Sequence, residues 1–396
     1  MYSTTKAARF WQLAFSAILL GFVVSCEDPG SVGATFVDES EVKVDTILLS
    51  GMPLTSVDPY MGKLSSSPVG KFSDPMFGDI ETITFFKPDV DRLSTDTLFA
   101  DDVLRLKLKV NTAYVYGDTL SEGTYNIYRV TSSWRGTTYK LSDDISTDAE
   151  LIGSFSDADV DTNGFVRADL GGSWRTTYQQ YFEMEDDSAR DADYRANDFG
   201  LAIVPDPSNT KILYTTMGSS SIEIAGEDTT VYTMLDWGHD VSRTNIPVNG
   251  SEITLQSTYE NVLQLDITDA VRSSNLKNIV RAELVFSEDT LAMQNSLGDN
   301  EVRSRVSSLG LTQGEIEDKA YEFGFSDNQI VGYFLSGKFR FNVTGIVNAS
   351  LYADEPLNNI FVYGNTPSGV LGFTSIYSTS TTDPDKAPRL VIYGIE

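Results

Sequence analysis

The sequence predicts an all-β protein: jelly-roll-like β-sandwiches in two related halves, with one short helical insertion near residues 305–323. Three observations lead to this fold class. Short apolar runs alternate with polar residues at the period of two that half-buried strands require. Clusters of Gly, Pro, Asn and Asp separate these runs, as turns do. The chain is 41% hydrophobic and 11% aromatic, which is ample material for packed cores.

Residues 1–25 have the pattern of a secretory signal peptide. Lys6 and Arg9 form a basic region, and the apolar run over 11–24 is shorter than the ~20 residues of a membrane span. Residues 23–26, Val-Val-Ser-Cys, then fit a bacterial lipobox, in which the cysteine is acylated, for instance with palmitate. We therefore expect a lipid on Cys26, the only cysteine. A plain signal anchor with an incidental cysteine is the alternative.

The mature chain is strongly acidic. Removal of residues 1–25 leaves 27 Lys and Arg against 57 Asp and Glu, a net charge of −30. This charge argues against a nucleic-acid partner and against adsorption of the protein body to anionic lipids. The sequence has no P-loop and no G-x-G-x-x-G motif, so no nucleotide is expected. The membrane is the predicted partner, held through the lipid anchor.

Residues 26–40 have the composition of a tether, and the β pattern begins at Glu41. The first half, 41–226, is expected to contain one helix over 174–184 and then a solvated acidic loop over 185–193. Its predicted strands cover residues 42–49, 82–86, 103–110, 125–130, 151–155, 165–170, 199–204, 211–215 and 221–224.

The second half, 227–396, continues the strand pattern. Its predicted strands cover residues 231–235, 252–256, 262–266, 281–286, 338–343, 359–363, 370–376 and 388–393. Between them, Gly310, Gly314 and the charged segment 315–322 interrupt the pattern, which favours the helical insertion. A boundary at residue 226 would separate two sandwich halves, and a single interleaved domain is the alternative.

Two pairs of segments are similar to each other, which is why related halves are expected. Residues 266–271, Asp-Ile-Thr-Asp-Ala-Val, resemble residues 342–347, Asn-Val-Thr-Gly-Ile-Val. Residues 133–139, Ser-Trp-Arg-Gly-Thr-Thr-Tyr, resemble residues 173–178, Ser-Trp-Arg-Thr-Thr-Tyr. Because each similarity is short, coincidence is the alternative.

Several motifs together resemble a family of uncharacterised Bacteroidota envelope lipoproteins, a domain of unknown function. They are the lipobox, the segment 70–78 with its Asp-Pro turn, and the segments 199–203, 236–240 and 280–285. The acidic pair that follows Cys26 resembles the signal that exports such lipoproteins to the outer leaflet. The resemblance implies an outer-membrane, surface setting and no established catalytic residues.

A second resemblance, to DNRLRE-type β-sandwich modules, overlaps the first. It involves residues 125–139, the Asp/Asn-Ile/Val-Thr elements and the closing segment 388–392. In those modules the tryptophan is usually followed by x-Glu, whereas Arg135 and Gly136 follow Trp134 here. Like the first resemblance, this one implies a jelly-roll-like sandwich at a cell surface.

One acidic segment matches the first half of a calcium loop, in which alternate side chains direct oxygens toward one point. Its candidate ligands are Asp157, Asp159, Asp161 and Asn163. The bidentate Glu that such a loop carries at its twelfth position is missing, since Leu170 stands there. The alternative is a hairpin with a type I′ turn at Asn163-Gly164.

The tryptophans and the histidine are the remaining candidates. Trp134, Trp174 and Trp237 could stack against sugar rings, and burial in sandwich cores is the alternative. His239 is the only histidine and no G-x-S-x-G motif accompanies it, so we expect a turn residue rather than a Ser-His-Asp triad.

These observations favour a non-enzymatic outer-membrane or cell-surface lipoprotein that acts in envelope structure, in adhesion, or in binding of an envelope protein or glycan. The alternative is a carbohydrate-active hydrolase that uses paired carboxylates. Calcium is the one cofactor that the sequence suggests. A hydrolase predicts two carboxylates in a concave pocket, a glycan-binding module an aromatic surface, and a subunit of a larger complex an exposed apolar patch.

Overall fold

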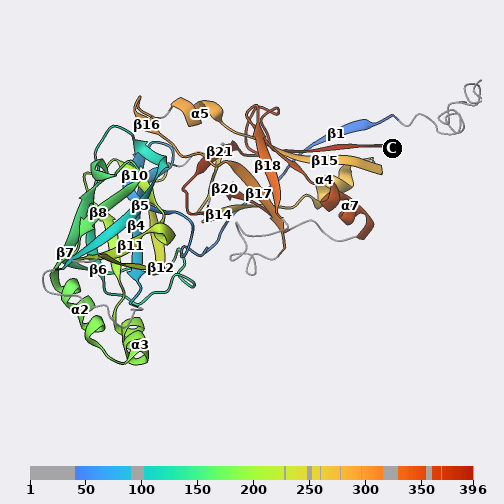
Figure 1. Cartoon of the computed structure of the whole chain (residues 1–396). Coiled ribbons are helices and arrows are strands. Elements are labelled where there is room, and N and C mark those ends of the chain that lie inside the picture. The colour runs from blue at the N-terminus through green and yellow to red at the C-terminus, as the bar shows by residue number, and fades with distance from the viewer. Residues whose placement is uncertain are drawn as a thin grey trace, which may run out of the picture.

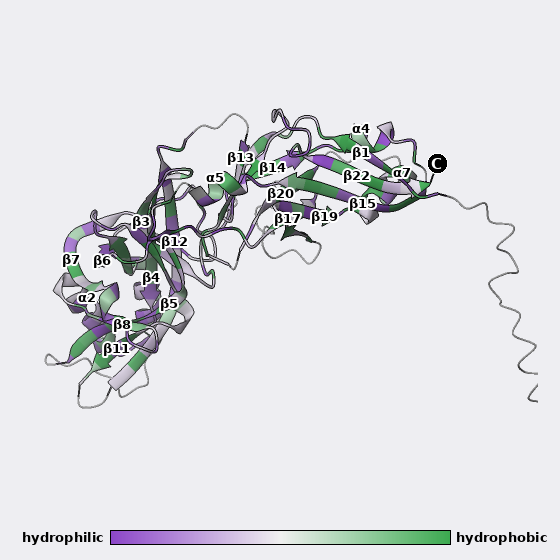
Figure 2. Cartoon of the chain, turned by 90° about the horizontal axis from the view of Figure 1, so that it is seen from above, coloured by the Kyte–Doolittle hydropathy of each residue, from purple (hydrophilic) through white to green (hydrophobic). Residues whose placement is uncertain are grey.

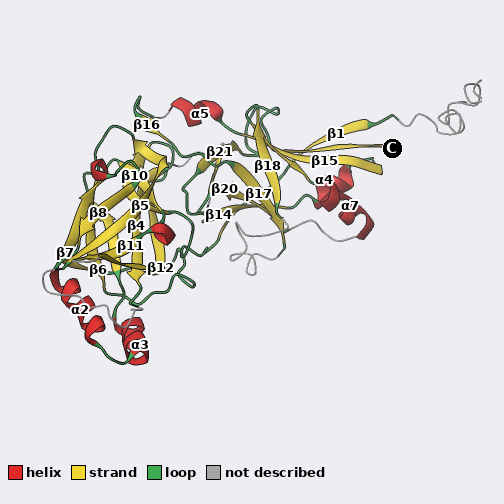
Figure 3. Ribbon diagram, viewed as in Figure 1, coloured by secondary structure: helices red, strands yellow, loops and turns green. Residues whose placement is uncertain are grey.

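The computed structural model describes residues 41–395 apart from 91–101, 227–228, 248–251, 259, 277, 296, 315–328, 354–358 and 367. Strands make up most of the described chain, and each pair of named strands is antiparallel (Figure 1, Figure 3). Hydrophobic and hydrophilic residues alternate along many strands, as a half-buried sheet requires (Figure 2). The all-β, sandwich-like fold class is therefore confirmed.

A nine-stranded sheet forms one part of the molecule. It curves around a core to which strands from both of its edges contribute, including Ile47, Leu263 and Phe341. In spatial order its strands are β1 (Lys43–Leu48), β22 (Arg389–Ile395), β15 (Asn278–Ser287), β19 (Lys338–Asn342), β18 (Ile330–Leu335), β17 (Ser308–Gln313), β20 (Ile360–Asn365), β14 (Asn261–Leu265) and β2 (Leu54–Ser56). A small sheet of β13 (Glu252–Gln256) and β21 (Phe373–Tyr377) adjoins it.

An eleven-stranded sheet forms the other part. Its main path runs β12 (Thr229–Thr244), β11 (Ser221–Ala225), β5 (Val103–Asp118), β10 (Lys211–Thr215), β3 (Ser67–Asp74), β4 (Gly78–Pro88), β9 (Leu201–Pro205), β6 (Thr124–Val130) and β7 (Thr147–Ser156). β8 (Phe165–Asp169) and β16 (Glu301–Val302) also pair with β5. Because the long β12 pairs with β11 through its first half and with β4 through its second, six strands close into a ring.

The strands of each sheet come from both expected halves of the chain. β1 and β2, at the start of the described chain, lie in the sheet that is otherwise built from residues after 260. β12 and β16, which follow residue 226, lie in the other sheet. Pairing in the sheets therefore does not change at residue 226.

Five α-helices are described: α2 (Gly172–Glu183), α3 (Asp187–Asn197), α4 (Thr268–Ser273), α5 (Thr290–Asn295) and α7 (Thr344–Ala353). α2 confirms the helix expected over 174–184. The expected loop over 185–193 is wrong, because α3 begins there. Asp186 caps α3 by accepting from the Ala189 amide, and Arg190 and Tyr194, four residues apart, are buried. These two features stabilise a helix that the acidic composition of the segment does not indicate.

The helical insertion expected near 305–323 is corrected in its first part. Residues 308–313 form β17, which pairs with β18 and β20 and buries Leu309 and Leu311 in the core. Residues 315–328 lie outside the described residues. Gly310 lies within β17. Glycine is needed there because a Cβ at this position would lie 2.5 Å from the Tyr363 ring.

One of the two sequence similarities corresponds to a shared local structure. α4 and α7 each follow a strand through an Asx turn: Asp266 Oδ1 accepts from the Thr268 amide at 2.9 Å, and Asn342 Oδ1 from the Thr344 amide at 3.1 Å. The second similarity is coincidental in structure, because Trp134 lies in a loop whereas Trp174 lies in α2.

The eleven-stranded sheet shares a hydrophobic core with β21 of the small sheet and with the segment before β21. Phe77 stacks on Phe373 with ring centroids 4.7 Å apart, and Tyr116 packs against the same Phe373 ring at 5.6 Å. Ile212, from β10, and Leu371, from the segment before β21, extend this core. The segment 70–78, distinctive in the sequence, therefore forms part of this junction.

Candidate functional site

Cys26 and the rest of the signal pattern lie outside the described residues, so lipid attachment stays a prediction. The described chain begins at Glu41, 15 residues after Cys26. No helix among the described residues has the length and apolar character needed to cross a membrane.

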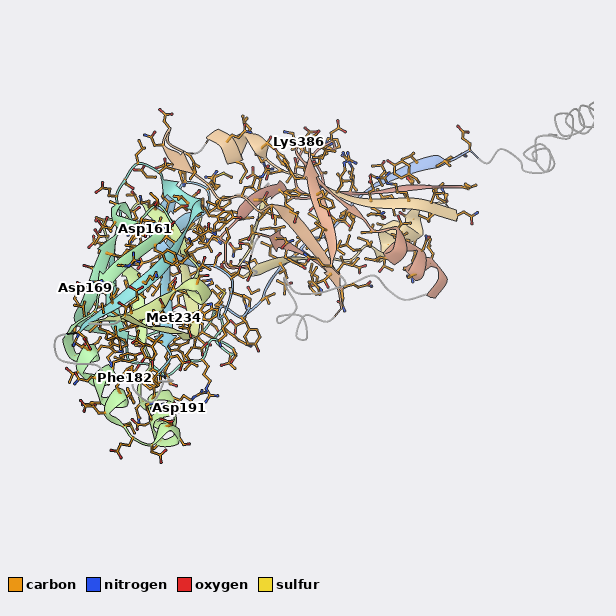
Figure 4. All side chains as sticks on the ribbon, in the orientation of Figure 1. Asp161, Asp169, Phe182, Asp191, Met234 and Lys386 are labelled. Atoms are coloured by element: carbon orange, nitrogen blue, oxygen red, sulfur yellow. The ribbon has the colours of Figure 1, made fainter. Side chains whose placement is uncertain are left out.

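The carboxylates of the candidate calcium loop already have partners within the chain. Asp157 accepts from the Gly123 amide at 2.7 Å and forms an ion pair with Lys211. Asp159 is exposed, in a single 3-10 turn. Figure 4 marks Asp161 on the part of the molecule that the eleven-stranded sheet forms.

Asp161 stabilises the turn that follows it. One of its oxygens, Oδ1, accepts from the amides of Asn163 at 2.8 Å and Phe165 at 2.9 Å. These bonds to its charged form, first of all the one from Phe165, lower the pKa of Asp161. Within the described residues, no group of three or more His, Cys, Asp or Glu side chains has the arrangement of a metal site.

The alternative reading of this segment, a type I′ hairpin, is wrong in detail. Gly164 has a φ of +75°, but Asn163 has no positive φ, and a type I′ turn needs both. β8, which follows the turn, pairs with β5. The segment is therefore a tight local turn that leads into β8, which lies beside the ring strand β5.

Trp174 cannot stack on a sugar in this conformation. It is fully buried in α2, where its ring stacks on Tyr178 with centroids 4.7 Å apart. The hydrophobic core of the eleven-stranded part surrounds both side chains. This residue matches the alternative of burial in the core.

Trp134 and Trp237 are half-buried, and their indole N–H groups donate to backbone carbonyls. Trp134 Nε1 lies 2.8 Å from the Phe199 oxygen, and Trp237 Nε1 lies 2.9 Å from the Leu64 oxygen. The Trp134 ring also packs edge-on against Phe85 at 4.7 Å. Both side chains thus hold loops against the sheet, and sugar stacking on their exposed edges stays a prediction.

The loop that carries Trp134 crosses β12 at close range. The Gly136 amide in this loop donates to Asp236 Oδ2 at 2.9 Å. Gly62, in a second loop, forms an antiparallel β-bridge with Gly238 of the same strand. A Cβ on Gly136 would lie 2.2 Å from Asp236 Oδ1 and 2.6 Å from the Trp237 carbonyl oxygen. A side chain at position 136 would therefore collide with β12.

Just after this crossing, the loop covers an acidic cavity of about 290 Å³. Its walls come from β4, from the loop over 141–145 and from β12. Four carboxylates line it: Glu81, Asp143, Asp144 and Asp240. The apolar wall consists of Ile83, Leu141, Ile145 and Val241, and Ser242 completes the lining. We take this cavity as the candidate functional site.

Asp240 differs from an ordinary surface carboxylate. Burial raises its pKa from 3.8 to about 6, and the negative charges of Asp144 and Asp143 act in the same direction. The Tyr139 hydroxyl, which donates to Asp240 Oδ1 at 2.6 Å, opposes this rise. Asp240 therefore stays protonated up to a higher pH than an isolated carboxyl does, as a general acid must.

His239, next to Asp240 in sequence, is not a turn residue. It lies in β12 opposite Thr84 and is 1% exposed. Burial lowers its pKa to about 3, so the imidazole is neutral near pH 7. Because neighbouring strand residues alternate between faces, His239 and Asp240 point to opposite sides of the sheet. The histidine therefore does not face the acidic cavity.

Sequence reasoning did not find this cavity. It noted the segment 236–240 and expected paired carboxylates in general, but many acids in the chain were equally eligible. Three segments far apart in sequence supply the carboxylates, and only strand pairing and the glycine crossing bring them together. No local spacing rule could have selected them.

No family model and no curated protein match the chain. Weak similarity exists to a solved structure of a candidate secreted protein from Parabacteroides distasonis, with 8% identity, a TM-score of 0.20, and coverage of 86% of this chain and 100% of that one. The infectious bursal disease virus VP2 subviral particle gives 10% identity, a TM-score of 0.13, and coverage of 90% and 78%. Similarities of this size establish neither a shared fold nor a shared function.

Proposed function

We propose that this chain is a non-enzymatic lipoprotein of the outer membrane or cell surface, anchored through Cys26, which acts in envelope structure, in adhesion, or by binding an envelope protein or glycan. The supporting observation is the position of Cys26. A lipobox ends at this residue, and an extensive all-β body begins only 15 residues later. Only a short tether thus separates the proposed lipid from a body with large exposed sheet faces.

Two measurements test the anchor. Intact mass spectrometry of the protein from native membranes should give a mature chain that begins at Cys26 with acyl groups attached. The Cys26→Ser variant should lose the acyl mass and leave the membrane fraction. A bare Cys26 in a protein recovered from the cytosol would contradict the proposal.

A hydrolase is the second candidate, and one specific observation favours it. Asp240, with a pKa of about 6, shares a concave cavity with Asp143, Asp144 and Glu81. A carboxyl with a raised pKa that shares a cavity with further carboxyls is the arrangement that glycoside hydrolysis uses.

The two candidates separate in an activity screen. If the cavity is catalytic, glycoside or polysaccharide hydrolysis should fall by at least about 100-fold in Asp240→Asn, in line with the contribution of a general acid. Asp159→Asn, at an exposed site outside the cavity, is the matched control. Binding to envelope material that is unchanged in Asp240→Asn, without turnover, supports the non-enzymatic role.

A further inference from the structure

One face of the nine-stranded sheet has no role in the candidate site. In β22, β15 and β19, alternate side chains such as Ile392, Leu284 and Phe341 point into the core. The residues between them point the other way. Strand register aligns Val44 with Tyr393 and Arg281, and Arg340 with Val285 and Tyr333. We call this surface, from β1 across β22, β15 and β19 to β18, the outer face.

The outer face exposes large apolar side chains at both of its ends. On β18, Tyr333 is 72% and Leu335 is 68% exposed. On β1, Val44 is 57% and Leu48 is 52% exposed. Exposed apolar groups that gather on one face characterise surfaces that contact a partner or a membrane.

The middle of the outer face is basic, in a chain with a net charge of −28. Arg281 and Arg340 both pair with Glu283, whose side chain is only 7% exposed, while theirs are 60% and 44% exposed. Lys338, opposite Leu335, adds a third cation. Since two guanidinium groups share one carboxylate, the face has a positive surplus and fits an anionic surface.

The position of this face in the chain favours a membrane over a soluble partner. β1, its edge strand, is the first strand after the proposed lipid site. The 14 residues between Cys26 and Glu41 span at most ~50 Å when fully extended. The tether therefore keeps β1 within one protein diameter of the bilayer, where basic and apolar side chains together bind anionic lipid.

We propose that the outer face lies against the anionic headgroups of the membrane that holds the lipid anchor. This inference rests on the proposed anchoring through Cys26 and adds an orientation. The nine-stranded part lies on the bilayer, and α2 and α3, at the far end of the molecule (Figure 1), extend away from it. The acidic body thus contacts lipid through a face that carries a positive surplus.

Fluorescence quenching by headgroup-labelled lipid tests the orientation. The acylated full-length protein carries one engineered thiol, Thr46→Cys on the outer face or Ser188→Cys on α3, labelled with a fluorophore and reconstituted in vesicles. In phosphatidylcholine vesicles with added phosphatidylglycerol, we expect strong quenching at position 46 and none at position 188. Arg340→Gln should lower the ratio of lipid-bound to free outer face about fivefold, because each cation near an anionic surface contributes about that factor to the equilibrium constant. Arg195→Gln on α3 should have no effect.

The outcomes separate the two proposals. Failure of the protein to associate with any vesicle would overturn the lipid anchor and the orientation that rests on it. Association with equal quenching at positions 46 and 188 would leave the anchor intact and overturn the orientation. Shielding at position 46 that is independent of phosphatidylglycerol and grows with protein concentration would show that a second copy or another protein covers the face, and would also overturn it.

Discussion

Arg303, which follows β16, and Asp74, in β3, form a buried ion pair beside the junction core, where Arg303 also lies over the Phe77 ring. Arg303 Nε and Nη2 each lie 2.7 Å from an oxygen of the Asp74 carboxylate, and the two side chains are 3% and 0% exposed. The Tyr116 hydroxyl donates to the same carboxylate at 2.7 Å. Asp74 also caps its own turn by accepting from the amides of Met76 and Phe77. One carboxylate therefore serves both the local turn and the junction.

Removal of this carboxylate should strongly destabilise the protein. Asp74→Ala removes the carboxylate that neutralises the buried Arg303 charge, so we expect the free energy of unfolding to fall by about 3–5 kcal/mol. The matched control is Asp169→Ala, which breaks an exposed pair with Arg105 and should cost at most about 1 kcal/mol. Urea unfolding measures both values, and equal losses in the two variants would contradict the role of the junction.

The glycine crossing gives a second prediction. Gly136→Ala places a Cβ 2.6 Å from the Trp237 carbonyl oxygen, so the loop must shift away from β12. We expect a loss of about 1–3 kcal/mol, the usual cost of overpacking. Gly345→Ala is the control, because a Cβ there meets nothing within 4 Å and lies in α7, where Ala is favoured. Thermal unfolding that is unchanged in Gly136→Ala would refute the close approach.

The cavity carboxylate predicts an unusual pH dependence. Because folding raises the pKa of Asp240 from 3.8 to about 6, its contribution to stability is complete below about pH 4 and is lost as the pH rises through 6. Asp240→Asn keeps an acceptor for Tyr139 and should be more stable than the parent at pH 7, by on the order of 1–3 kcal/mol. Asp159→Asn should show no such gain.

His239 acts in the opposite direction over an overlapping range. Since folding lowers its pKa from 6.5 to about 3, its contribution is complete above pH 6.5 and is lost as the pH falls through 3. The two groups therefore partly cancel in the parent protein. In Asp240→Asn, stability should fall more steeply on acidification from pH 6.5 to 4 than in the parent, as chemical denaturation across that range can measure. Parallel curves would show that the pKa assignment of Asp240 is wrong.

The turn at Asp161 predicts how the acidic segment responds to calcium. Since its carboxylate oxygens already accept from backbone amides and contact Arg167, added calcium should leave the melting temperature unchanged. Asp161→Ala should destabilise the turn, because two backbone amides lose their acceptor, whereas Asp159→Ala should have little effect. Calcium-dependent stabilisation that Asp159→Ala abolishes would restore the calcium-site interpretation.

Several features could be predicted from local sequence because local physics determines them. Period-two alternation over 103–110 and 125–130 specifies β5 and β6 wherever they pair, and the repeated Asx-Ile/Val-Thr element forms the same Asx turn before α4 and before α7. The lipobox prediction for Cys26 likewise depends on adjacent residues alone. α3 was missed because its helical signal is a cap and two buried side chains, whose burial a sequence does not record.

The chain alone determined that strands would form, that one cysteine is available for a lipid and that the net charge is strongly negative. Only the tertiary structure decided which strands became neighbours, because pairing depends on the burial of whole sheet faces and on closure of the ring through β12 and β4. That pairing brought Asp240 to Asp143 across about a hundred residues, and it placed Arg281 beside Arg340 on a basic face of an acidic protein.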